Sequence, residues 1–191
     1  MAVSYEPVKA VGTLSGVGFP VMRRIVEHET QTFLAGQPLI LEGGGVKAAA
    51  DPTDAAIIGF AAEAGHNLTA AHTAEDGHSE GAPPNQPLGK TVALGAWVKD
   101  GRCAVYLGVP DTVFRAFLTA GEVYTEAIKG NQYRMAKDAT TGHYYIEIAH
   151  GSAAEAAHCV KILDVDPSSP NSIAGGAAVY FTVPALSYLG T

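Results

Sequence analysis

A pentapeptide with the residue types of a nucleophile site is the first candidate for chemistry in the chain. Gly77 to Gly81 reads GHSEG and matches the G-x-S-x-G pattern of the nucleophile elbow in α/β-hydrolases. That elbow needs a strand before the serine and a helix after it, whereas AHTAED precedes this pentapeptide and APPNQP follows it. Neither element is expected from such sequences. A hydrolase that uses Ser79 is therefore kept only as an alternative, and we predict that the protein is not an enzyme.

Three evenly spaced histidines form a second candidate, for a metal site. His66, His72 and His78 are six residues apart, with Glu75 and Asp76 between the last two. Imidazole and carboxylate groups bind transition metals. A spacing of six, however, aligns side chains neither on a helix nor in a tight zinc-binding turn. We therefore predict a solvated loop, with no metal and no cofactor.

The composition describes an acidic chain with few charges. The 191 residues include 12 Lys and Arg against 19 Asp and Glu, and charged residues make up 16 %, against a typical ~25 %. Because binding to a nucleic-acid backbone needs basic patches, we expect no direct contact with nucleic acid. No stretch reaches the ~18 continuous apolar residues of a membrane helix, and the first residues lack a secretory signal pattern. We expect neither membrane insertion nor secretion.

Short alternating runs of apolar and polar residues, typical of β-strands, occupy most of the chain. The clearest are 91–99 and 102–109, joined by an Asp-Gly dipeptide that favours a type I′ hairpin turn. Residues 111–120 fit a helix or a strand, and we favour the strand because strands flank it. Residues 123–129 suit one or two helical turns. Further strands are expected at 38–41, 46–49, 56–61, 133–137, 143–149, 158–165 and 176–183.

These segments predict a mainly β fold, a sandwich or barrel of about nine short strands with one or two short helices. Gly59, inside an apolar strand, indicates a close approach of another backbone. Residues 65–89 show no periodic pattern and predict a long exposed loop. Cys103 and Cys159 are far apart in sequence, which favours two small buried side chains and leaves a disulfide open.

The N-terminal residues 1–25 have no lasting period, although they are too apolar for a solvated tail. Two interpretations remain open. The segment is either an extended arm that lies on another molecule or an irregular loop packed on its own domain. If it is an arm, it would cross neighbouring subunits of an assembly, and we expect Phe19, Val21, Arg23 and Arg24 to make the contacts.

Four motifs, in their order along the chain, resemble the head decoration (capsid cement) proteins of tailed bacteriophages. The likeness covers about residues 26–184. The motifs are AGQPLIL at 35–41 with GGVKAA at 44–49, DAAIIGFAA at 54–62, a hairpin with GNQYRM at 130–135 and TGHYYI at 141–146, and VKILDVDP at 160–167 before a final strand.

The resemblance implies a β-barrel or β-tulip-like decoration domain at 26–191, with 26–110 and 111–191 as candidate halves and the loop 65–89 between strands. It implies a structural virion protein on the outer surface of an icosahedral head, made in the host cytoplasm. There it would bind the major capsid protein and bridge its subunits, as a homotrimer or, alternatively, a dimer. A phage tail, fibre or carbohydrate-binding β-module is the main alternative function.

Overall fold

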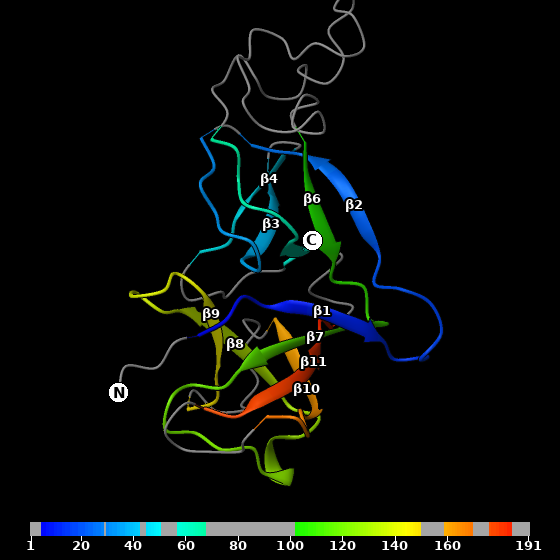
Figure 1. The fold of residues 1–191 in the computed structure, drawn as a ribbon, viewed down its shortest axis with the longest axis vertical. Coiled ribbons are helices and arrows are strands. Elements are labelled where there is room, and N and C mark those ends of the chain that lie inside the picture. Colours follow the sequence, from blue (N-terminus) through cyan, green and yellow to red (C-terminus); the bar gives the residue numbers. More distant parts are fainter. Residues whose placement is uncertain are drawn as a thin grey trace, which may run out of the picture.

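The computed structural model describes residues 5–28, 30–42, 45–50, 57–67, 102–149, 159–169 and 176–184. These residues form a mainly β structure of two antiparallel sheets, which lie one above the other along the long axis (Figure 1). The single helical element among them is one turn of 3-10 helix, η3 (Glu126–Ile128). The predicted mainly β fold is confirmed.

The lower sheet in Figure 1 has six strands in the order β1-β7-β11-β10-β8-β9. Along the chain these strands are β1 (Lys9–Thr13), β7 (Thr112–Phe117), β8 (Gln132–Lys137), β9 (Tyr144–Glu147), β10 (Val160–Val165) and β11 (Ala178–Thr182). The alternation expected at 111–120 is seen in β7, where Thr112, Phe114 and Ala116 are buried and their neighbours only partly so. The strand interpretation of this segment is therefore confirmed over the helical one.

The upper sheet has five strands in the order β2-β6-β5-β3-β4. They are β2 (Met22–Val26), β3 (Pro38–Glu42), β4 (Gly45–Ala48), β5 (Gly59–Ala61) and β6 (Arg102–Leu107). Gly59 makes the predicted close approach, because a Cβ atom there would collide with the carbonyl oxygen of Tyr106 on β6. The other strand of the predicted Asp-Gly hairpin, residues 91–99, lies outside the described residues.

Each sheet curls, so that two strands that are not neighbours in the strand order approach each other at a single bridge. An isolated parallel bridge joins Glu27, just after β2, to Val46 on β4, and another joins Leu118, just after β7, to Ile146 on β9. Each contact is a single bridge rather than a continuous ladder. The barrel-like character of the fold therefore consists of two curled sheets that are not closed.

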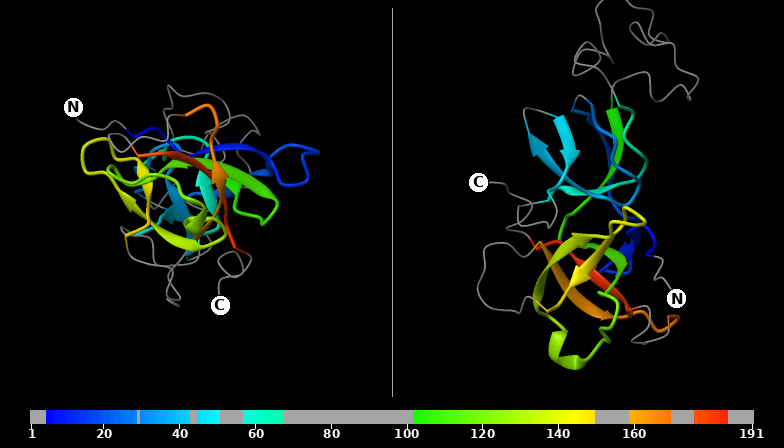
Figure 2. Two further views of the ribbon diagram at one scale, coloured as in Figure 1. Left: turned by 90° about the horizontal axis from the view of Figure 1, so that it is seen from below. Right: turned by 90° about the vertical axis from the view of Figure 1, so that its left-hand side faces the viewer.

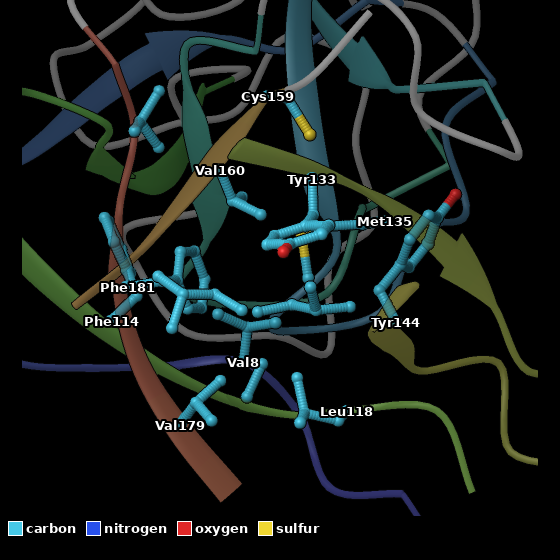
Figure 3. Close-up of a cluster of buried hydrophobic side chains, with 14 of the residues drawn as sticks. Val8, Phe114, Leu118, Tyr133, Met135, Tyr144, Cys159, Val160, Val179 and Phe181 are labelled. Carbon is cyan, nitrogen blue, oxygen red and sulfur yellow. The ribbon is translucent and has the colours of Figure 1, made fainter. Parts of the chain in front are cut away.

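A large apolar core lies inside the lower sheet and extends up to the base of the upper one (Figure 3). At the junction, the Phe60 ring lies 4.7 Å from the Phe114 ring and 5.6 Å from the Phe181 ring. Because such aromatic contacts add to the apolar area buried, this trio joins the two sheets. The upper sheet has a smaller core of its own, made of Phe33, Leu39, Val46, Ala61, Cys103 and Val105.

The N-terminal segment differs from the expected extended arm. Residues 9–13 form β1, which pairs with β7 in the lower sheet, and residues 22–26 form β2, which pairs with β6 in the upper sheet. The sequence hid these strands because β1 carries a bulge between Ala10 and Gly12, and because β2 begins with three polar or half-exposed side chains, Met22, Arg23 and Arg24. The interpretation of residues 1–25 as an extended arm on another molecule is therefore wrong for both strands, which pack on their own domain as regular strands and not as an irregular loop.

Candidate functional site

The connection between β1 and β2, residues 14–21, projects from the side of the molecule where the two sheets meet (Figures 1 and 2). This loop exposes an unusually large number of apolar side chains. Phe19 is 91 % exposed, Val17 80 % and Leu14 55 %. The described residues expose eight large hydrophobic side chains, and six of them lie in this loop or in the strands beside it. We call these six the apolar patch: Val11, Leu14, Val17, Phe19, Val21 and Met22.

The loop is held in place at both ends. At its start, Leu14 N–H donates to the Asp111 carbonyl at 2.8 Å and Ser15 N–H donates to Asp111 Oδ1 at 3.1 Å. The Thr13 hydroxyl donates to the Val17 carbonyl at 3.1 Å, which closes the turn. At its end, the Val21 carbonyl accepts a bond of 2.8 Å from Leu107 N–H on β6. The apolar side chains are thus presented on an ordered support.

Two glycines make this turn feasible. Gly16 has φ of 66° and Gly18 of 98°, both in the left-handed region that side-chain-bearing residues rarely adopt. Pro20 follows and fixes its own φ near −65°. The apolar residues of the loop therefore alternate with residues that bend or stiffen it.

The four side chains predicted as contacts differ in their surroundings. Phe19, Val21 and Arg23 are exposed, and Arg23 makes no ion pair with any described residue. Arg24 is turned to the scaffold, where Nη2 donates to the Arg102 carbonyl at 2.6 Å and Nη1 lies 3.5 Å from Glu63 Oε1. The sequence argument missed Val11, Leu14, Val17 and Met22. Their spacing gives no periodic signal, so the sequence alone does not show that they are exposed.

A cluster of charged side chains lies at the other end of β2, and we call it the buried charge cluster: Arg24, Glu27, Glu63 and His66. Glu27 is completely buried. Its two carboxylate oxygens lie 2.7 Å from the backbone N and from Nδ1 of His66, and the Glu63 carboxylate accepts a 2.7 Å bond from Ala104 N–H. These contacts fasten the segment after β5 to β2 and β6.

The buried charge cluster is closed to substrates in this structure, since the His66 side chain is only 6 % exposed and Glu27 not at all. Cys103 is also fully buried there. Burial first, and the nearby Glu27 and Glu63 carboxylates second, raise the pKa of its thiol to about 12. The thiol is therefore a poor nucleophile at neutral pH. The arrangement is that of a structural cluster and not of a Cys-His catalytic pair.

Other predicted chemistry falls partly outside the described residues. Ser79 and the GHSEG segment lie outside them, as do His72 and His78 of the histidine series. Within the described ranges, no group of three or more His, Cys, Asp or Glu side chains is placed to hold a metal, and no helix is long and apolar enough to cross a bilayer. Cys103 and Cys159 are both buried and form no disulfide, as expected for small apolar side chains.

A further carboxylate, that of Asp166 in the lower sheet, is held by several polar contacts. Asp166 is almost completely buried and lies 2.6 Å from Arg115 Nε, and it also accepts bonds from Ser168 and from the Tyr180 hydroxyl. The Arg115 contact is the main reason that the pKa of Asp166 lies far below its ordinary value. This group fixes the end of β10 against β7 and β11.

The geometry thus leaves the apolar patch as the candidate functional surface, with the charged groups in supporting roles. Searches of protein-family models, curated proteins and solved structures found no match to this chain.

Proposed function

We propose that this protein is a head decoration protein of a tailed bacteriophage, which binds the outer surface of the capsid and stabilises the shell. The observation that carries the proposal is the apolar patch on an ordered, projecting loop. Soluble monomers rarely concentrate apolar side chains in this way, and such patches mark sites of protein contact. The order of the sequence motifs from 35–41 to 160–167 resembles that of phage head decoration proteins, and this resemblance is the reason for proposing that family.

A cement protein acts by mass action. It binds the assembled shell better than separate subunits, so each bound copy lowers the free energy of the closed state. Only contact area is needed, and no chemical step is required. A compact β scaffold with a presented apolar loop meets that need, and the excess of 19 acidic over 12 basic residues suits a protein that stays outside the packaged genome.

Self-association would increase the effect. In the expected trimer, three β1–β2 loops would engage up to three capsid subunits at once, and the linked contacts would give an avidity that a single loop lacks. A dimer would present two. Light scattering of the purified protein distinguishes the two states.

The test uses expanded heads that lack the protein. Purified protein is added, the heads are sedimented, and bound protein is measured as a function of its concentration. Saturable binding, together with a higher temperature of head disruption, is expected. Absence of saturable binding contradicts the proposal, and the formation of rings or fibres, or retention on glycan columns, favours a tail or fibre module instead.

A further inference from the structure

We infer that the β1–β2 loop inserts its side chains into an apolar pocket of the major capsid protein whose rim carries carboxylates, an inference that rests on the proposed function. The partner of the loop is thus a protein surface with an apolar pocket and an acidic rim. A lipid bilayer and a second copy of this chain are the alternatives that the experiment below tests.

The structure favours insertion of side chains over pairing of strands. β1 is an edge strand of the lower sheet among the described residues, and a free edge can add a partner strand. Its edge is interrupted by the bulge at Val11 and carries the exposed Lys9, and both features discourage pairing between edges. Phe19 and Val17, in contrast, have almost all of their surface free.

The ordered support lowers the cost of binding. Immobilising flexible side chains and loops on association costs conformational entropy, which weakens binding. Here Asp111 and Thr13 already hold the start of the loop, and Leu107 holds its end. Phe19 also has only two side-chain torsions to fix. These properties are those of a hot-spot residue, an aromatic anchor that fills a pocket and is surrounded by weaker contacts.

Charge indicates the rim of the pocket. Residues 7–26 hold three of the chain's 12 Lys and Arg and none of its 19 Asp and Glu. Arg24 is used within the scaffold and Lys9 pairs with Glu6 at 2.7 Å, so Arg23 is the basic side chain beside the loop that is left for a partner. Complementary charge at a rim sets the association rate and its salt dependence. An apolar pocket would accept the exposed apolar side chains of the loop, and carboxylates on its rim would pair with Arg23.

The experiment measures binding to heads lacking the protein for the wild type and two pairs of variants. Phe19→Ser tests the anchor, and Leu41→Ser is its control, because Leu41 is also exposed but lies on β3, away from the loop. Arg23→Glu tests the rim, and Lys161→Glu, an equal change of charge on the exposed face of β10, is its control. Circular dichroism and thermal unfolding check that every variant is folded.

We expect Phe19→Ser to weaken binding by about 30-fold or more, the scale of a hot spot, and Leu41→Ser to leave it unchanged. Arg23→Glu should weaken it by about 3- to 10-fold, mainly in the association rate, and high salt should reduce this difference. Lys161→Glu should have little effect.

The failures are distinguishable. If the wild type does not bind heads at all, the proposed function fails and the inference with it. If the wild type binds and Phe19→Ser binds equally well, the function survives and the docking loop is wrong. Unchanged or tighter binding by Arg23→Glu rejects the carboxylate rim. Phe19-dependent binding to phosphatidylcholine–phosphatidylglycerol vesicles, or Phe19-dependent self-association, would assign the loop to a membrane or to a second copy.

Discussion

Apolar side chains are usually buried and charged side chains are usually exposed. The segments before and after β2 both depart from this rule, the first by exposing apolar side chains and the second by burying charged ones. Before β2, the β1–β2 loop exposes Phe19 and Val17 to solvent. After β2, Glu27 is buried with His66 against it, and Glu63 lies close by. Apolar groups are thus exposed before this short strand, and charged groups are buried after it.

The difference between the two regions lies in their partners. Every described member of the buried charge cluster has a polar contact within the chain, so the cost of taking its charges out of water is offset locally. The apolar patch has no comparable cover within the chain's described residues. Buried charged side chains that find polar partners within the chain are part of the scaffold. Exposed apolar side chains that nothing in the described chain covers indicate a binding partner.

The largest effect is expected from Glu27→Ala. It removes the carboxylate that contacts Nδ1 of the buried His66 ring and the acceptor of the His66 backbone N–H, and leaves Glu63, 3.9 Å from Nε2, as the remaining carboxylate beside the ring. A buried polar group that loses its hydrogen-bond partner costs about 1–3 kcal/mol, and two His66 nitrogens lose theirs, so we expect this variant to lose the most stability. Denaturant unfolding measures the loss, and Glu126→Ala, at an exposed position on η3, is the control and should change stability little. A Glu27 variant as stable as the wild type would contradict the structural role of the cluster.

Asp166→Asn extends the comparison to a buried carboxylate in the lower sheet. The pKa of Asp166 is held below its ordinary value of 3.8, mainly by Arg115. The carboxylate therefore contributes stability that is present above pH 4 and is lost as the pH falls toward the depressed pKa. At pH 7 we expect the variant to be less stable by about 2 kcal/mol, the scale of hydrogen bonds to a charged group.

Unfolding midpoints measured from pH 7 down to the acid range check this prediction. The gap between wild type and Asp166→Asn should narrow below about pH 4, because Asp166 then binds a proton in the unfolded chain while it stays ionised in the folded chain until the depressed pKa is reached. A gap that stays constant with pH would mean that the charge of Asp166 contributes nothing.

A smaller effect is expected from Asp111→Ala at the base of the β1–β2 loop. The substitution removes the acceptor of Ser15 N–H and a contact to its hydroxyl, while the Asp111 carbonyl still holds Leu14. Global stability should fall by about 1 kcal/mol or less, as for exposed hydrogen bonds. Amide hydrogen exchange at Ser15 should accelerate, and head binding should weaken several-fold, because the loop must then be ordered on binding. Unchanged exchange would show that the loop is held by other contacts.

The smallest effect on stability is expected from Phe19→Ser. The ring is almost fully exposed, so its removal takes nothing from the core. The unfolding free energy should stay within about 0.5 kcal/mol of the wild type. Thermal unfolding followed by circular dichroism measures this. A clear destabilisation would place Phe19 in the scaffold and remove the contrast with Glu27.

Alternation predicted the sheets well where one face of a strand is buried. β7 and β9 were expected from the sequence, and they follow the pattern because both belong to the lower sheet, whose inner face is filled with apolar side chains. β1 and β2 escaped prediction because a bulge breaks the period of one and exposed or charged residues begin the other. A local pattern carries no information about pairing partners some 80 or 100 residues away.

The candidate functional surface could be predicted only in part from the sequence, for the same reason. Phe19, Val21 and Arg23 were expected as contacts because they are apolar or basic residues in an aperiodic segment. The role of Arg24 depends on Glu63 and Arg102, which are distant in sequence, and the buried charge cluster likewise unites residues 27, 63 and 66 through the fold alone. Deletion of residues 2–24 is not a specific test of the loop, because it would also remove β1 and most of β2.

Photo-crosslinking from the tip of the loop tests the central claim most directly. Phe19 is replaced by p-benzoylphenylalanine, the variant is bound to heads and irradiated, and the adducts are identified by mass spectrometry. The same replacement at Leu41 is the control. We predict an adduct between position 19 and the major capsid protein and none from position 41. Adducts from position 41 alone, or from position 19 only to another copy of this chain, would contradict the assignment of the β1–β2 loop as the capsid-docking element.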